Sequence, residues 1–286
     1  MNIRLKTVLE TADRVVLNNN SSGYGTDTYS GTVVHTDADT VHVGVDLGTA
    51  YTVIFVLDKN GTPLAGEYRF AQVVRDGVVV DFMGAIDLVR AMKERMETRL
   101  GFSLTSAAAS YPPGVNKSEV RAVRHILESS GLECSNLVDE PSAANTLLQV
   151  DNGVIVDIGG GTTGLAVIEN GTVVYTADEP TGGTHMTLVV AGSHKVPFDS
   201  AEAMKIDPTK HDRLGPILRP VMEKIGTIIQ THVERFTVER IYLVGGTSNF
   251  GGIAEVVQGV TGIPTVVPGN PLFVTPIGIA MNDGGK

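Results

Sequence analysis

Two aspartates, each followed by glycines and threonine at the end of an apolar run, are the residues of this 286-residue chain best suited to chemistry. Asp46 precedes Gly48 and Thr49, and Asp157 precedes a longer run, Gly159-Gly160-Gly161-Thr162. Glycines let backbone N–H groups approach phosphate oxygens, threonine adds a donor, and a carboxylate can hold hydrated Mg²⁺. Two such loops that face each other predict a site that grips the β- and γ-phosphates of a nucleotide from both sides.

A third glycine-rich segment follows the apolar run Ile241 to Val244 and begins Gly245-Gly246-Thr247. Glycines at this point would let an adenosine lie flat against the backbone. An ordinary strand-to-helix turn is the equally weighted alternative, because glycine is also the usual residue of tight turns.

The surroundings of the two aspartates repeat over a distance of 111 residues. In each copy an apolar strand runs into the Asp-x-Gly turn, a second apolar run follows, and an Asn-Gly pair (Asn60-Gly61 or Asn170-Gly171) comes next. Asn-Gly between apolar strands favours a type I′ hairpin turn. The pattern therefore predicts two copies of a three-stranded unit, one in each of two lobes, with Asp46 and Asp157 as exposed carboxylates of the cleft between them.

Helical patterns alternate with these strands, which is typical of an α/β fold. One apolar stripe falls in residues 86–100, and a second helix is predicted from Asn116, with Glu119 as its capping-box partner, to Gly131. The stripe of a third predicted helix consists of Leu214, Ile217, Val221, Ile225, Ile228, His232 and Phe236.

The first 40 residues form a separate unit in this interpretation. Residues 3–17 have the spacing of a short amphipathic helix, a polar stretch follows at residues 18–23, and no strand is predicted before Val41. The helix could pack on its own domain or on a partner surface. We expect a detachable attachment element.

Composition excludes several classes of protein. With 42% hydrophobic and 19% charged residues the chain has enough apolar material for a core, and its net charge of −10 argues against nucleic acid or an anionic membrane as a partner. A single cysteine, Cys134, excludes an intramolecular disulfide. Prolines interrupt the longest uncharged run, residues 256–282, and no signal-type segment opens the chain, so a cytoplasmic protein without a membrane span is predicted.

Five segments in order resemble the motifs of the actin and heat-shock-chaperone ATPase superfamily. They are the phosphate-1 motif (Val43 to Thr52), the first connecting helix (Val138 to Ala144), the phosphate-2 motif (Asp157 to Thr163), the adenosine motif (Leu243 to Gly252) and the second connecting helix (Thr275 to Ala280). The resemblance implies an actin-like fold of duplicated ribonuclease-H-like lobes. Residues 41–145 and 270–286 would form lobe I, residues 146–269 lobe II, and residues 1–40 the helix and its tether.

The same resemblance implies a site for ATP and Mg²⁺. Asp46 and Asp157 match the metal-side carboxylates, and Glu140 matches the residue that positions the attacking water. The residues matched to the nucleotide are Gly48, Thr49, Ala50, Gly159, Gly160, Gly161, Thr162, Glu202, Lys205, Gly245, Gly246 and Thr247. Gly164 departs from the pattern, because relatives usually carry Asp or Glu there, and this predicts slow or absent hydrolysis.

Within the superfamily the chain is most similar to the EutJ family, on Val73 to Val78, Tyr111 to Gly114, Asp157 to Leu165 and Thr181 to His185. That family implies a chaperone-like protein of ethanolamine utilisation whose partner is an ethanolamine-pathway enzyme or a shell protein of a bacterial microcompartment. A degenerate adaptor or scaffold that does not hydrolyse ATP is the alternative. A small-molecule kinase and a filament-forming actin relative are further possibilities.

Only 61 residues separate Gly183 from Gly245, and the predicted helices use about half of them. The remainder allows linkers and one hairpin, which is too little for the subdomain that closes over adenine in longer relatives. A reduced second lobe, with the base held on one face by Glu202 and Lys205, is therefore predicted. Discrimination between ATP and GTP should then be small.

Overall fold

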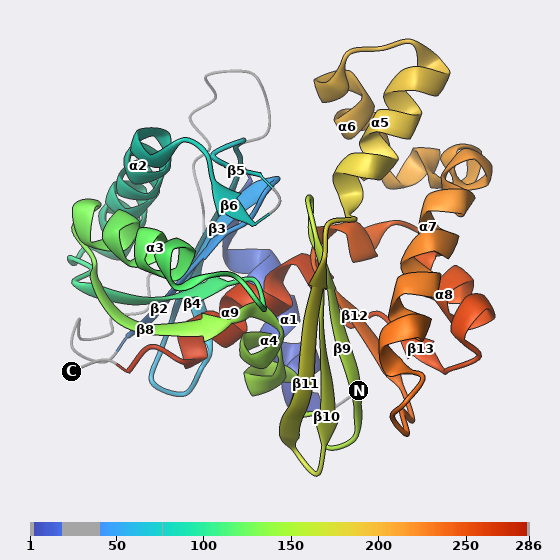
Figure 1. The fold of residues 1–286 in the computed structure, drawn as a ribbon. Helices are drawn as coiled ribbons and strands as arrows, with labels where there is room; N and C mark the ends of the chain where they lie inside the picture. The colour runs from blue at the N-terminus through green and yellow to red at the C-terminus, as the bar shows by residue number, and fades with distance from the viewer. Residues whose placement is uncertain (1–2, 19–40, 76, 285–286) are drawn as a thin grey trace.

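The computed structural model describes residues 3–18, 41–75 and 77–284 (Figure 1). Its α-helices, strands and 3₁₀ turns (η) are, in chain order, α1 (Ile3–Val15), β1 (Val16–Asn18), β2 (His42–Leu47), β3 (Tyr51–Leu57), β4 (Pro63–Phe70), β5 (Val74–Arg75), β6 (Val78–Val79), α2 (Phe82–Leu100), β7 (Ser106–Tyr111), α3 (Lys117–Ser129), β8 (Glu133–Asp139), α4 (Glu140–Leu148), β9 (Gly153–Ile158), β10 (Thr163–Glu169), β11 (Thr172–Glu179), α5 (Gly183–His194), α6 (Phe198–Ile206), η2 (Pro208–Lys210), α7 (His211–Val233), β12 (Ile241–Val244), η3 (Gly246–Asn249), α8 (Ile253–Thr261), β13 (Thr265–Val266), η4 (Pro271–Phe273) and α9 (Val274–Met281).

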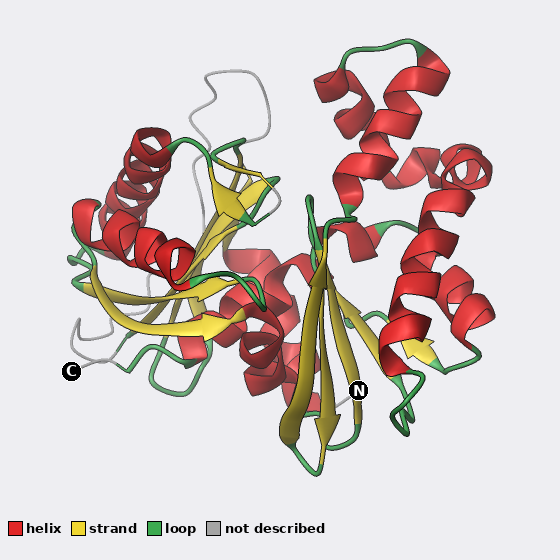
Figure 2. Ribbon diagram, in the orientation of Figure 1, coloured by secondary structure: helices red, strands yellow, loops and turns green. Residues whose placement is uncertain are grey.

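Two mixed sheets organise the chain (Figure 2). The first has the strand order β1-β4-β3-β2-β7-β8, and the second has the order β11-β10-β9-β12-β13. Each contains an antiparallel three-stranded meander, β2-β3-β4 or β9-β10-β11, whose first strand also pairs in parallel with a later strand, β7 or β12. The predicted duplication is confirmed, and it places Asp46 and Asp157 at matching positions of the two sheets.

The two meanders differ in their second turn. In the second copy Asn170 and Gly171 have φ values of 51° and 72°, as the predicted type I′ turn requires. In the first copy the loop is longer, and the Asp58 carboxylate accepts hydrogen bonds from the backbone N–H groups of Asn60 and Thr62, both at 2.8 Å. The two-residue turn predicted at Asn60-Gly61 is therefore wrong, because the Asp58 side chain stabilises a wider loop.

Helices cover the outer faces of the sheets and fill the space between them. The apolar faces of α2 and α3 pack on the first sheet, and α5 to α8 pack on or near the second. Helices α4 and α9 cross between the sheets (Figure 1). A Cβ atom on Gly278 of α9 would lie 1.9 Å from the carbonyl oxygen of Ala143 in α4, so glycine is required where the two helices cross.

Helix α1 packs on this same central region. Its buried side chains are Leu5, Val8, Leu9 and Ala12. They join a core shared by Phe55 of β3 and Phe273 of η4, and β1 pairs in parallel with β4. The prediction of a detachable helix with no strand before Val41 is therefore wrong, because the apolar stripe is buried in the protein's own core. The predicted tether falls largely on residues 19–40, outside the described residues.

Beyond its sheet, the second lobe is small and consists of helices. Residues 183–240, all within the described part, contain α5, α6, η2 and α7 and no strand. The hairpin that the residue count allowed is therefore absent from residues 183–240, and this range contains helix α5 instead. None of the described helices combines the length and the apolar character needed to cross a bilayer.

Candidate functional site

One cleft between the two sheets is lined by every residue of the predicted site. Its empty volume, which opens to solvent, is about 800 Å³. The cleft is also lined by Tyr51, Pro112 and Thr275, which lie within the matched motifs but were not assigned to the site, and by Ile206 and Leu272, which lie outside the motifs. The fold therefore brings together segments that lie up to about two hundred positions apart, which the motifs alone did not require.

Matching loops from the two meanders form the floor of the cleft. The backbone N–H of Gly48 donates to the carbonyl of Tyr51 (3.1 Å), and that of Gly159 donates to the carbonyl of Thr162 (3.0 Å), which gives two equivalent tight turns. The turns touch, since a Cβ atom on Gly160 would lie only 2.7 Å from the Cβ atom of Ala50. Glycine at position 160 thus allows the loops to approach from opposite lobes.

Three carboxyl groups converge beside these loops. Burial, and then the charge of Asp157, raise the pKa of Asp46 to about 7 against a hydrogen bond from Ser110. Burial raises the pKa of Asp157 to about 6 against a 2.5 Å hydrogen bond from the Thr275 hydroxyl. Burial, and then the charges of Asp46 and Asp157, raise the pKa of Glu140 well above its usual value. The three carboxylates therefore repel one another when they are ionised, and this repulsion favours the binding of a cation.

The donors at this cluster fit a hydrated Mg²⁺ ion that arrives with a phosphate. Among the described residues no group of three or more His, Cys, Asp or Glu side chains is arranged to hold a metal ion. Mg²⁺ usually keeps several waters and takes one or two carboxylates together with substrate phosphates. Asp46 and Asp157 would supply those carboxylates, and the ion would neutralise their charge and that of the phosphates.

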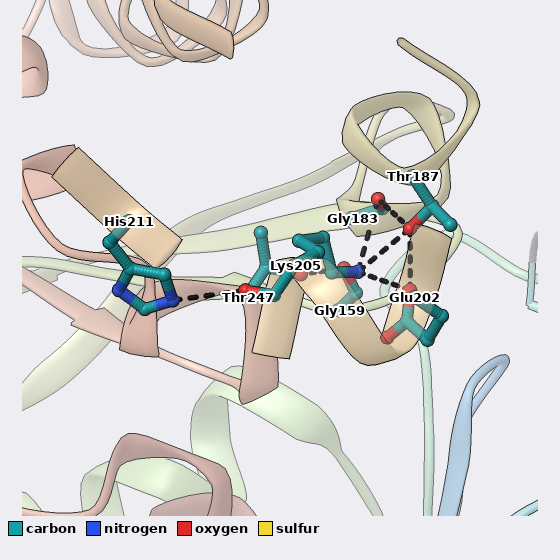
Figure 3. Close-up of polar contacts among 7 residues, drawn as sticks. All are labelled: Gly159, Gly183, Thr187, Glu202, Lys205, His211 and Thr247. Atoms are coloured by element: carbon teal, nitrogen blue, oxygen red, sulfur yellow. Dashed lines mark hydrogen bonds and ion pairs between the residues drawn. The ribbon is translucent and has the colours of Figure 1, made fainter. Parts of the chain in front are cut away.

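Glu202 and Lys205 of α6 lie in the cleft wall but face each other (Figure 3). They are 6% and 8% exposed, and Lys205 Nζ lies 2.7 Å from Glu202 Oε2. Lys205 Nζ also donates to the Gly183 carbonyl (3.2 Å) and to Thr187 Oγ1 (3.0 Å). Burial lowers the pKa of Lys205, while the charge of Glu202 raises it. The pair therefore joins α6 to α5, a role that the motif did not indicate.

The adenosine-type motif is built into the second loop. A Cβ atom on Gly245, whose φ is 84°, would lie 2.2 Å from Asp157 Oδ1, so this glycine makes room for the aspartate. Thr247 Oγ1 donates to the Gly159 carbonyl at 2.8 Å (Figure 3). Gly245 and Thr247 therefore hold in place the loop of Gly159 to Thr162, which we call the phosphate-side loop, and Gly246 lines the cleft.

A second cavity adjoins the cleft at Gly246 and Thr247. Its lining includes aromatic side chains from both sides, namely Tyr51, Tyr68, Phe273, His211 and Phe250. A base bound at Gly246 would lie beside these side chains, and the one-sided base site stays a prediction. His211 donates from Nε2 to the Lys205 carbonyl and accepts at Nδ1 from the Gly251 N–H, both at 2.9 Å, which fixes its ring. Tyr51 and Phe250 lie within the matched motifs, but no sequence signal marked Tyr68, His211 and Phe273, because they come from separate segments.

Comparison with known proteins identifies the class of this fold. A sequence profile described as MreB/Mbl protein matches residues 65–199, and one described as type IV pilus assembly protein PilM matches residues 141–274. The crystal structure of MreB5 of Spiroplasma citri bound to ADP superposes with a TM-score of 0.67 and 19% identity, over 85% of this chain and 95% of that chain. The fold is that of the actin-like ATPases, as predicted.

Two relatives define the family more narrowly. Ethanolamine utilization protein EutJ of Salmonella typhimurium is 41% identical over 85% of this chain and 86% of its own length. The crystal structure of EutJ from Carboxydothermus hydrogenoformans has a TM-score of 0.86 and 41% identity, and the alignment covers 97% of both chains. The chain belongs to the EutJ family of ethanolamine utilization proteins.

Proposed function

We propose that the protein is a chaperone-like ATP-binding protein of ethanolamine utilization that holds ATP with Mg²⁺ in the cleft between its lobes. The observation that carries this proposal is the meeting of the two glycine loops, at Gly160 and Ala50, beside a cluster of buried carboxyl groups. Backbone N–H groups of such loops bind phosphate oxygens, and the carboxyl cluster favours a cation. The ADP bound to MreB5 of Spiroplasma citri, which shares the fold, supports a nucleotide as the ligand.

Hydrolysis should be slow or absent. A carboxyl group can accept a proton from water only when it is ionised, and the pKa of Glu140 is well above its usual value. Burial and the charges of Asp46 and Asp157 disfavour the ionised form of Glu140, and a cation beside these aspartates would lower its pKa again. Nucleotide would then act mainly by favouring the closed arrangement of the two lobes.

A non-hydrolysing adaptor or scaffold is the alternative function, and the absence of a side chain at Gly164, beside Asp178 and Pro141, supports it. The proposed partner is an ethanolamine-pathway enzyme or a shell protein of a bacterial microcompartment, and the proposed location is the cytoplasm, in association with that microcompartment. Phosphate release, measured with and without ethanolamine ammonia-lyase, separates the two functions. A rate that rises with the enzyme supports the ATPase, and an unchanged absence of release supports the adaptor.

A steric variant tests nucleotide binding at the cleft. Gly160→Ala adds a Cβ atom that would meet Ala50, whereas a Cβ atom on Gly192 in α5 would meet nothing within 4 Å, so Gly192→Ala is the matched control. Competition with a fluorescent ATP analogue should show binding by the parent and by Gly192→Ala and a large loss in Gly160→Ala. Equal binding by all three proteins would place the nucleotide elsewhere.

A further inference from the structure

A fourth carboxyl group lies behind the proposed phosphate site, on the strand next to Gly164. Asp178 of β11 pairs with Gly164 of β10 across the antiparallel ladder. A Cβ atom on Gly164 would lie 3.5 Å from Asp178 Oδ1, 3.5 Å from Pro113 and 3.8 Å from Pro141. The carboxyl group of Asp178 therefore borders the space that a side chain at position 164 would use.

One oxygen of this carboxyl group is buried without a hydrogen-bond partner. Asp178 Oδ1 is inaccessible to solvent and receives no hydrogen bond from the described residues. A buried carboxylate oxygen left without a donor is costly, so such an oxygen normally binds water or an ion. The position thus indicates a bound water next to Gly164.

The neighbours of Asp178 belong to the proposed site. Burial, together with the charges of Asp157 and Glu179, raises the pKa of Asp178 to about 6 against a side-chain hydrogen bond with Thr162. The charge of Asp178 in turn raises the pKa of Glu140. Asp178 does not itself line the cleft, but it contacts the phosphate-side loop at Thr162 and lies within electrostatic reach of the carboxyl cluster.

We infer that Asp178 is a positioning residue whose carboxylate borders the open space at Gly164 from β11 and orients water between Thr162 and Glu140. The inference rests on the proposed function, because its effect is on Mg²⁺ and nucleotide in the cleft. The charge of Asp178 would act on Mg²⁺ through the water molecules bound to the ion, and on the rest of the site through Glu140. A neutral residue at 178 of the same shape should keep the loop in place and lose this effect.

The test is calorimetric titration of the full chain with ATP, with and without Mg²⁺. Asp178→Asn should melt no lower than the parent and keep its Mg²⁺-free affinity, but it should reduce the gain in affinity that Mg²⁺ provides by about tenfold, as loss of outer-sphere partners usually does. Glu179→Gln is the matched control, since Glu179 is the next residue of β11, its carboxylate contacts His232, and its replacement leaves the carboxylate of Asp178 in place. It should retain the full Mg²⁺ gain.

A double variant that moves the carboxylate from β11 to the facing position of β10 provides a second test. The double variant Gly164→Asp, Asp178→Gly moves the carboxylate to the facing position and should restore most of the Mg²⁺ gain lost in Asp178→Asn. Full Mg²⁺ gain in Asp178→Asn, or no recovery in the exchange variant, overturns the inference while nucleotide binding stands. A parent chain that binds no ATP overturns the proposed function and the inference with it.

Discussion

Replacing Asp157 by Asn is expected to stabilise the ligand-free protein at alkaline pH and to weaken its binding of Mg²⁺-ATP. Asp157 is 8% exposed, and its pKa is raised from the ordinary 3.8 to about 6. The prediction that Asp157 is an exposed cleft carboxylate is therefore wrong, and its replacement is expected to change the stability of the folded chain. The Asn side chain keeps an oxygen for the Thr275 hydroxyl.

The direction of this pH-dependent change in the free energy of unfolding follows from proton linkage. Since the pKa is higher in the folded than in the unfolded chain, the folded state binds the proton more tightly, and the free energy of unfolding falls as pH rises from about 4 to about 6. At 1.36 kcal/mol per pH unit, the penalty for ionising Asp157 reaches about 3 kcal/mol at about pH 8. Asp157→Asn removes this penalty, so the variant should be more stable than the parent by up to that amount.

Urea unfolding followed by circular dichroism, in metal-free buffer at about pH 4 and about pH 8, measures the difference. Asp151→Asn is the control, because Asp151 is exposed on the turn that precedes β9. The variant should gain stability over the parent only at the higher pH, and the control should follow the parent at both. An Asp157→Asn protein less stable than the parent at about pH 8 would refute the assignment of a burial penalty to this carboxylate.

Three further predictions concern the core, the buried ion pair and the base. Leu9→Ala in α1 should lower the free energy of unfolding by about 2–5 kcal/mol in urea titrations, because Leu9 is 2% exposed; an unchanged value would restore the detachable helix. Lys205→Met should cost about 3–5 kcal/mol by leaving Glu202 buried and unpaired; the double replacement with Glu202→Leu should cost less, and equal losses would argue against the pair. ATP and GTP should differ in Kd by less than about tenfold in calorimetry, since both ring nitrogens of His211 are already hydrogen-bonded; strong adenine preference would contradict this.

The duplicated meander and its aspartates were predictable because their constraints are local. In each copy a strand of apolar residues ends in an Asp-x-Gly turn, and this pattern recurs at Asp46 and Asp157. Helix positions were less predictable. In α7 the predicted stripe included Ile217, Val221 and Ile228, whereas the buried face carries Leu218, Met222 and Ile229. Both sets follow helical spacing and differ by one residue, so periodicity alone could not choose between them.

Contacts between distant segments could not be predicted from local pattern. The amphipathic stripe of α1 indicates that one face is covered but does not say by what, and its place beside Phe273 depends on the whole fold. The three-residue spacing of Glu202 and Lys205 permits an ion pair on any helix, but their burial against α5 is a tertiary effect. The place of Asp178 beside Gly164 depends on strand register in the same way.

A crystal structure of the protein soaked with Mg²⁺ and a non-hydrolysable ATP analogue tests the central claim most directly. The triphosphate should lie between the loop of Gly48 to Ala50 and the loop of Gly159 to Thr162, with a hydrated ion beside Asp46 and Asp157. Nucleotide density outside the cleft, or an empty cleft at saturating analogue in crystals that leave it open to solvent, would contradict the claim.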